Sequence, residues 1–282
     1  MGNVLDGAVL SAAAATDLPK GFEVTEYSNT VNALLFNMDS DFSGNEDLRL
    51  ALARATDISK LSKTGNALAQ GIVPDCCNAV SGTLYRETAG PAKGPGFDLK
   101  KAKKSYATAM EKFEAVATED EPAPTSFAIT FLCLKEDKQA AQSIVQNWQK
   151  VFGTALSTTI DTRDTEEELR QALVAGNFDV AFAPLRCSEL NAIGLLRQFS
   201  GDTEANLMNL ASDEYDHLIT LAASARDAET VTGYCFAAEE YLTKNGILLP
   251  ISQETTCLAV KEKTAAGLQV YPTGNTYLLY LI

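Results

Sequence analysis

The chain has 282 residues, of which 46% are hydrophobic, and a formal net charge of −14 from 37 acidic and 23 basic residues. This length and composition can bury a substantial core, in one large domain or in two small ones. The acidity argues against a nucleic-acid-binding protein, which needs a basic face, and against adsorption to an anionic membrane surface.

The first third of the chain predicts helices separated by strands. Val9–Ala15 is too short and its side chains are too small for the core of a signal peptide, so we expect a helix packed beneath a strand. Asn45 or Ser43 is suited to cap the next helix. The expected helices cover residues 9–15 and 46–56, residues 58–68 can form a further short helix, and strands are expected over 22–27 and from residue 32 onward.

The middle of the chain changes from loop to regular α/β alternation. Residues 73–96 are rich in glycine and proline and predict a loop, and Asp98 is suited to cap a helix that ends near Val116. The lysines early in that helix are expected to form a solvated face, with a transporter contact as the alternative. An acidic, proline-containing linker follows. Strands over 126–134, 155–161 and 177–183 then alternate with helices over 135–152 and 164–175, which indicates a parallel-leaning sheet.

The last hundred residues predict two more helices and several strands. A partly helical stretch is expected up to Phe199, and Ser212 begins a helix with acidic residues in its first turn. The long helix from Ala228 stops at Asn245 and Gly246, a pair typical of a left-handed cap. Strands are expected over residues 247–252, 255–260 and 276–282.

Several kinds of chemistry lack the residues they need. His217 is the single histidine, so multi-histidine metal sites are excluded, and we interpret it as a surface residue. No nucleophile elbow, phosphate-binding loop or dinucleotide-binding fingerprint is present. The six cysteines form no C-x-x-C pair, and the vicinal Cys76 and Cys77 bridge each other only with strain. We expect no catalytic residue, no metal and no cofactor, with the cysteines as core residues or, alternatively, with one structural disulfide among them.

Five stretches within residues 45–251 together carry a family pattern. They are Asn45–Asp57 (NEDLRLALARATD), Gly71–Pro74 (GIVP), Phe97–Lys103 (FDLKKAK), Ala175–Pro184 (AGNFDVAFAP) and Tyr234–Ile251 (YCFAAEEYLTKNGILLPI). In this order they resemble motifs of the extracytoplasmic solute-binding proteins of ABC importers, in the oligopeptide, dipeptide and nickel-binding family.

The resemblance implies a fold and a division of the chain. The fold is an α/β, periplasmic-binding-protein-like lobe (class II, peptide-binding type), with a mixed sheet flanked by helices. The expected divisions are a lobe-connecting helix and hinge strands over residues 1–35, the ligand-binding C-terminal lobe over 36–258, and return strands toward a first lobe over 259–282. Gly2–Ala8 resembles an internal segment of the family, so we expect the chain to be a C-terminal fragment of a periplasmic protein or a membrane-anchored lipoprotein.

The resemblance also places the ligand site in the loop after the strand over 177–183. Peptide-binding relatives carry W-x-x-D there, and in this chain Leu185 takes the tryptophan position and Ser188 the aspartate position. A neutral serine cannot make the charge-assisted hydrogen bond that holds an ammonium group. Glu189 could substitute if the loop shifts, or Arg186 could pair with an acidic group of the ligand; a plain surface ion pair of the two is the alternative. The expected site residues are Leu185, Arg186, Cys187, Ser188, Glu189 and Asn191.

The function that the resemblance implies is binding without catalysis. The protein would capture a solute, with an oligopeptide as the family expectation, and deliver it as a monomer to the membrane permease of an ABC importer. A ligand-sensing or interaction module with the same fold and a binder of a non-peptide solute are the alternatives.

Overall fold

The computed structural model describes residues 6–61, 66–79, 84–187, 191–201, 203, 205–265, 268–270 and 276–278. A mixed sheet runs through this part of the chain, with the strand order β1-β7-β2-β6-β4-β5 and with β3 paired to β7. Its strands are β1 (Gly7–Ser11), β2 (Phe22–Phe36), β3 (Ala67–Leu68), β4 (Phe127–Leu134), β5 (Leu156–Arg163), β6 (Val180–Arg186) and β7 (Leu248–Lys261). The predicted α/β fold class, a mixed sheet flanked by helices, is confirmed.

The α/β alternation predicted for the middle of the chain is present. Strand β4 pairs in parallel with both β5 and β6, and the connecting helices are α5 (Lys138–Phe152) and α6 (Glu166–Val174). Trp148 anchors α5, since its ring lies 5.6 Å from that of Phe131 and its indole N–H donates to the carbonyl of Leu52 over 3.1 Å. Gly176, with φ of 72°, adopts the left-handed conformation that ends the segment before β6.

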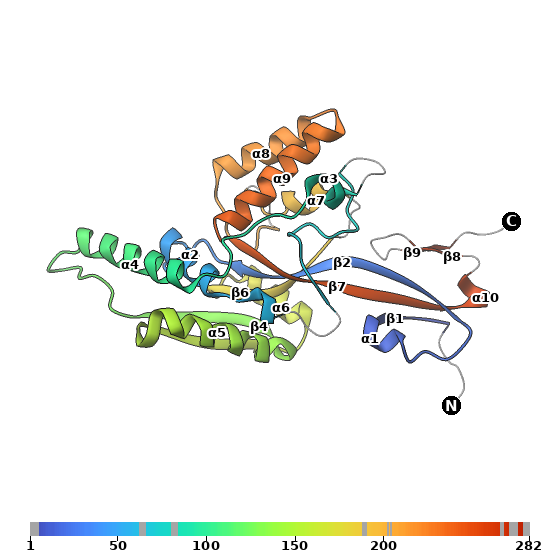
Figure 1. Ribbon diagram of the computed structural model, residues 1–282, viewed down its shortest axis with the longest axis horizontal. Helices are drawn as coiled ribbons and strands as arrows, with labels where there is room; N and C mark the ends of the chain where they lie inside the picture. The colour runs from blue at the N-terminus through green and yellow to red at the C-terminus, as the bar shows by residue number, and fades with distance from the viewer. Residues whose placement is uncertain are drawn as a thin grey trace.

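Side-chain alternation along the central strands buries both faces of the sheet. On β2, Ala33 and Leu35 belong to one hydrophobic cluster, while Leu34 and Phe36 belong to the other. In Figure 1, one helical layer contains α3, α7, α8 and α9 and the other contains α2, α4 and α5. The additional helices are α2 (Glu46–Ala55), α3 (Tyr85–Ala89), α4 (Leu99–Val116), α7 (Ala192–Arg197), α8 (Asp213–Ser224) and α9 (Ala228–Lys244), with 3₁₀ turns at Ile58–Lys60, Lys135–Asp137 and Gly153–Ala155.

The helix caps expected at Asn45 and Ser212 and the stop expected at Asn245 and Gly246 occur at the predicted residues. The side chain of Asn45 accepts from the backbone N–H of Leu48 over 3.1 Å, and Ser212 caps α8 in the same way. Helix α9 ends at Lys244, and Gly246 follows with φ of 62°. Short polar side chains and glycine decide these boundaries locally, which is why the sequence predicts them.

Strands β2 and β7 extend from the lobe into a narrow arm, on which β1 also lies (Figure 1). The two short strands predicted over residues 22–38 are wrong as separate elements, because β2 runs without interruption from Phe22 to Phe36. The register shifts between Tyr27 and Thr30, so a bulge lies in the stretch between the two predicted strands. The strands predicted over 247–252 and 255–260 likewise form the single strand β7, which pairs with β2 along most of its length.

Two predicted N-terminal helices differ from the structure. Residues 7–11 form β1, which pairs with β7 from Gly7–Val260 to Ser11–Thr256, and only α1 (Ala12–Ala15) is helical. The backbone bonds that β7 offers outweigh the helix preference of a short apolar run. The helix over 58–68 is also wrong: among the described residues of this range, 58–60 form a 3₁₀ turn and β3 at Ala67–Leu68 pairs with β7.

The arm also contains the last described elements of the chain. They are α10 (Glu262–Ala265), β8 (Leu268–Val270) and β9 (Thr276–Leu278). Of the strand predicted over 276–282, residues 276–278 are confirmed and the remainder lies outside the described residues. Among the described helices none is long and apolar enough to cross a membrane.

Candidate functional site

A cleft lies at the carboxyl ends of β4 and β6, where the lobe meets the arm. Its cavity measures about 280 Å³. Ligand sites of open α/β sheets gather at this end of the strands. The lining residues come from the end of β1, α1, β2, β7, the carboxyl ends of β4 and β6, the start of α6 and the neighbouring turns: Ser11, Ala12, Ala13, Asn32, Asn66, Leu134, Glu136, Asp137, Glu166, Pro184, Glu254 and Thr255.

Carboxylates dominate the polar lining of the cleft. Four acidic side chains contribute to it, from the turn after β4, the start of α6 and the middle of β7: Glu136, Asp137, Glu166 and Glu254. Arg186, the last residue of β6, donates to Glu166 over 2.5 Å, and both side chains are about half exposed, at 52% and 51%. Because an exposed pair contributes little to stability, Arg186 can exchange Glu166 for another acidic group at low cost.

The structure distributes the predicted site residues between the core and the surface. Leu185 and Cys187 are 8% and 1% exposed and belong to the hydrophobic core. Arg186 points to solvent, and the side chain of Asn191 accepts from the backbone N–H of Gly194 as the cap of α7. Ser188 and Glu189 lie outside the described residues. Strand alternation explains the split, since successive residues of β6 face opposite sides.

Backbone hydrogen bonds to the segments around Asn29 and Asn78 fix the chain before and after this predicted loop. The backbone N–H of Cys187 donates to the carbonyl of Asn29 over 2.8 Å, which ties the end of β6 to the bulge of β2. The N–H of Ala192 donates to the carbonyl of Asn78 over 3.0 Å, and Asn78 also bridges to Asn191. The segment around Asn78 therefore lies beside the predicted ligand loop.

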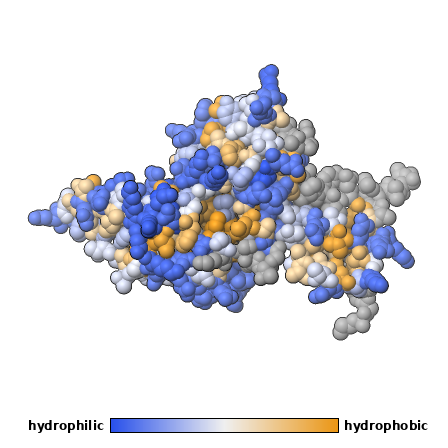
Figure 2. Space-filling view, in the orientation of Figure 1, coloured by the Kyte–Doolittle hydropathy of each residue, from blue (hydrophilic) through white to orange (hydrophobic). Residues whose placement is uncertain are grey.

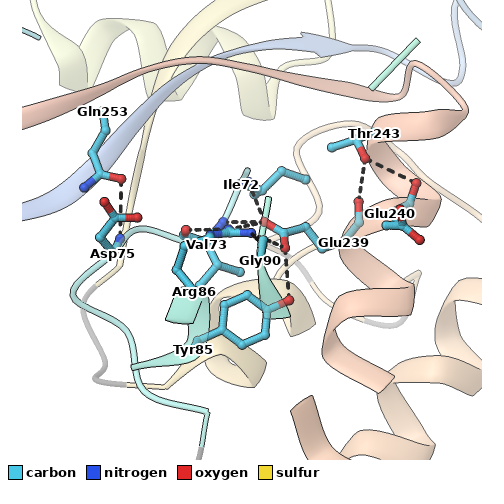
Figure 3. Close-up of polar contacts among 10 residues, drawn as sticks. All are labelled: Ile72, Val73, Asp75, Tyr85, Arg86, Gly90, Glu239, Glu240, Thr243 and Gln253. Atoms are coloured by element: carbon cyan, nitrogen blue, oxygen red, sulfur yellow. Dashed lines mark hydrogen bonds and ion pairs between the residues drawn. The ribbon is translucent and has the colours of Figure 1, made fainter. Parts of the chain in front are cut away.

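A buried ion pair anchors that supporting segment to α9 (Figure 3). The guanidinium of Arg86 contacts both carboxylate oxygens of Glu239, at 2.6 and 3.1 Å. Glu239 is fully buried and accepts three more hydrogen bonds, from the backbone N–H groups of Ile72 and Val73 and from the hydroxyl of Tyr85. Burial raises the pKa of Tyr85 well above its ordinary value, so the hydroxyl remains a donor.

Sequence reasoning missed this ion pair because its partners lie 153 positions apart. The resemblance placed Gly71 in a turn motif, and the structure gives the reason for a glycine there. An added Cβ would lie 2.3 Å from a carboxylate oxygen of Glu239 and 2.4 Å from a guanidinium nitrogen of Arg86. The backbone must approach the ion pair this closely for Ile72 and Val73 to donate to it.

A larger hollow of about 900 Å³ lies at the opposite ends of β4 and β6. Its polar groups hold the fold together. The carboxylate of Asp179 accepts from the backbone N–H of Thr130 over 2.6 Å and from the hydroxyl of Ser40, while Asn37 donates to the carbonyls of Gly176 and Phe178. Residues 176–179 of the Ala175–Pro184 motif therefore hold β4, β6 and the end of β2 together, and the smaller cleft is the better candidate for a ligand site.

The described residues contain no cluster of three or more histidine, cysteine, aspartate or glutamate side chains able to hold a metal ion. His217 is exposed on α8, as predicted. The Cys76, Cys77, Cys133, Cys187, Cys235 and Cys257 side chains are all buried thiols.

No protein-family model matches the sequence, and no curated protein matches it. Solved structures do match in fold. A structure of Listeria monocytogenes OppA bound to peptide aligns with a TM-score of 0.70 at 19% identity, over 98% of this chain and 54% of that one. The substrate-binding domain of an oligopeptide ABC transporter from Bacillus anthracis gives 0.73 at 17% identity, over 97% and 54%.

A third match is a dipeptide-binding protein from Pseudoalteromonas sp. SM9913 in complex with Met-Leu, with a TM-score of 0.70 at 18% identity over 94% of this chain and 51% of that one. The chain thus spans about half the length of these solved proteins. The matches confirm the fold that the sequence motifs predicted, a periplasmic-binding-protein-like lobe of the peptide-binding type.

Proposed function

We propose that this chain is a ligand-binding lobe of a solute-binding protein that captures an oligopeptide or related solute and delivers it to the permease of an ABC importer. The observation that carries the proposal is the position of the cleft, at the carboxyl ends of β4 and β6 in a fold shared with peptide-bound proteins. In this proposal the protein performs no chemistry. It works outside the cytoplasm, free in a periplasm or anchored as a lipoprotein, and as a monomer.

In this proposal the arm acts as the hinge between this lobe and a second lobe. Strands β2 and β7 connect the lobe to the arm without interruption (Figure 1), and a pair of continuous strands can bend as two lobes close over a ligand. Hydrophobic residues gather on the surface of the arm (Figure 2), where Val9 is 64% and Val24 is 40% exposed. A second lobe, as expected from the half-length match to solved proteins, would cover this apolar surface.

The cleft chemistry favours a ligand that carries positive charge on the side facing this lobe. Glu254 and Glu136 line the cavity, and Arg186 at its rim is already paired with Glu166. A carboxylate binds an ammonium group by a charge-assisted hydrogen bond. We therefore propose that the amino group of a peptide, or a basic side chain, is held by this wall, together with the loop that contains Ser188, Glu189 and Asn191.

Mass spectrometry of small molecules that co-purify with the natural gene product tests the proposal. We expect a stoichiometric peptide or related solute, and a Tm that rises when the ligand is added back. The 282-residue chain alone should gain little stability from the same ligand, because it supplies one wall of the cleft. A natural gene product that retains no solute and is stabilised by no peptide would contradict the proposed function.

Two glutamate variants link binding to the cleft. Glu254→Gln should weaken ligand binding by about tenfold, through loss of one charged contact. Glu111→Gln, on the exposed side of α4, is the matched control and should leave the affinity unchanged. Equal affinities for the two variants would place the ligand elsewhere.

A further inference from the structure

Two cysteine sulfurs from distant parts of the sequence meet inside the lobe. The Sγ atoms of Cys77 and Cys187 lie 2.7 Å apart, although 110 positions separate the residues. Cys77 precedes α3 and Cys187 directly follows β6, and both side chains are buried, at 0% and 1% exposure. This distance is close to the S–S bond length of about 2.05 Å, so a small shift of the two side chains would bring the sulfurs into bonding range.

The backbone on both sides keeps the two sulfurs together. The carbonyl of Cys77 accepts from the N–H of Tyr85 over 2.8 Å, and its own N–H donates to the carbonyl of Pro74 over 3.1 Å. The N–H of Cys187 donates to the carbonyl of Asn29 over 2.8 Å. Because a cysteine side chain is short, anchored backbones of this kind determine where its sulfur lies.

We propose that Cys77 and Cys187 form a structural disulfide when the protein folds in an oxidising compartment. The oxidant is a small-molecule or protein disulfide. The thiolate of one cysteine attacks it, which forms a mixed disulfide and releases one thiolate; the thiolate of the second cysteine then attacks the mixed disulfide and releases the other. Two thiols are oxidised to one disulfide, one disulfide is reduced to two thiols, and the two protons lost by the cysteines pass through solvent to the released thiolates.

The surroundings of the pair favour a permanent bond over a reversible switch. Cys76 lies beside the pair, and its hydrogen bond with Cys187 is the main cause that raises its pKa to about 12. The pKa of Cys77 is raised further, first by its own contact with Cys187. Thiolate is the attacking species, so these buried thiols exchange slowly once the lobe has folded. The bond therefore has to form before the core closes, after which burial protects it from reductants.

The bond would fix the candidate ligand loop to a rigid part of the lobe. The segment after Cys187 contains the predicted site residues Ser188, Glu189 and Asn191, and the segment around Cys77 is anchored by the Arg86–Glu239 ion pair (Figure 3). A covalent link between the two would restrain the loop from one side while a second lobe closes from the other.

Peptide mapping of the protein refolded with oxidised glutathione tests the pairing. Thiols are first blocked by alkylation in denaturant, and the digest is then analysed without and with reduction. We expect one linked pair that joins Cys77 to Cys187, with four of the six cysteines alkylated. Alkylation of all six, or a pair that joins any other two cysteines, would overturn the proposal.

Thermal unfolding of the wild-type protein under oxidising and reducing conditions gives a second test, and this comparison does not depend on the folding of a variant. Protein folded under oxidising conditions should melt about 5–15 °C higher than protein folded and kept under reducing conditions. Cys187→Ala should melt at the same temperature in both states, whereas Cys133→Ala, a buried cysteine in β4, should keep the full difference. A wild-type Tm that is independent of redox conditions would also overturn the proposal.

Discussion

Glu239 is a buried carboxylate on which several polar contacts of the lobe converge. It receives two contacts from Arg86 and three further hydrogen bonds, in a site with no access to water. Removal of one partner of such a pair leaves the other charge buried without compensation, which costs far more than the pair itself contributes. The neighbouring Glu240, at the same end of α9, pairs with Lys244 near the surface.

These adjacent glutamates form a matched test. We expect Glu239→Gln to lower the free energy of unfolding by about 3–5 kcal/mol, because Arg86 loses its counter-charge inside the core. Glu240→Gln should lower it by about 0–1 kcal/mol, since its partner is exposed. Urea titrations of both variants measure the difference. Equal losses would mean that water reaches Arg86.

Gly71 offers a second test at the same ion pair. Gly71→Ala should cost about 1–3 kcal/mol, because its Cβ would overlap both Glu239 and Arg86. Gly94→Ala is the control: its Cβ would meet nothing closer than 3.7 Å, and we expect a change within about 0.5 kcal/mol. Thermal unfolding of both variants checks the ranking, and a neutral Gly71→Ala would show that the ion pair can move aside.

At the scale of elements, helix caps decide where α2 and α4 begin. Asp98 accepts from the backbone N–H groups of Lys100 and Lys101, each over 3.0 Å, and Asn45 caps α2 with a neutral amide. The N–H of Lys101 is the main cause that holds the pKa of the Asp98 carboxyl below its ordinary value. The stabilising contribution of Asp98 is therefore present above its unfolded-state pKa and is lost as the pH falls through its lower folded-state pKa.

This difference predicts a pH-dependent and a pH-independent cap. Asp98→Ala should lower the Tm at pH ~7, and the gap to wild type should close as the pH falls below about 4. Asn45→Ala should cost about 0.5–2 kcal/mol across the same range, because an amide does not titrate there. Melting curves across that range distinguish the two. A constant gap for Asp98→Ala would show that the protonated carboxyl caps equally well.

Element boundaries were predictable where local chemistry sets them, and they were not where pairing sets them. Caps at Asn45, Asp98 and Ser212 and the stop at Gly246 depend on a few neighbouring atoms. The unbroken β2 depends on the distant strand β7, and so does the conversion of residues 7–11 to a strand. The ligand loop expected from the sequence follows β6, whose carboxyl end borders the candidate cleft, but none of the predicted site residues that the structure describes is among those that line it. The carboxylate lining was not predicted, because Glu136 and Glu254 are brought together by folding.

At the scale of the whole molecule, the net charge of −14 works against compactness. Like charges repel within the folded state, and salt shortens the range of that repulsion from about 30 Å at ~0.01 M to about 8 Å at ~0.15 M. We therefore expect the Tm to rise by a few degrees between these salt concentrations, with sodium and potassium chloride equally effective.

A double variant on the exposed face of α4 is the control for this effect. Glu111→Lys with Glu114→Lys changes the net charge from −14 to −10, since each substitution adds two charges. Its Tm should rise less with salt than that of the wild type. A wild-type Tm that falls as salt is added would show that attractive ion pairs, such as Lys112 with Asp47, outweigh the repulsion.

The sequence alone determined the α/β alternation from 127 to 186, the starts of α2, α4 and α8, the end of α9, and a fold shared with peptide-binding proteins. Periodicity and short-range hydrogen bonds are written into neighbouring residues, so each of these features can be read locally. Only the tertiary structure decided that Leu185 and Cys187 face the core, that Arg86 meets Glu239, and that Cys77 lies against Cys187. Those contacts join positions far apart in the chain, and the free energy that forms them comes from packing of the whole lobe.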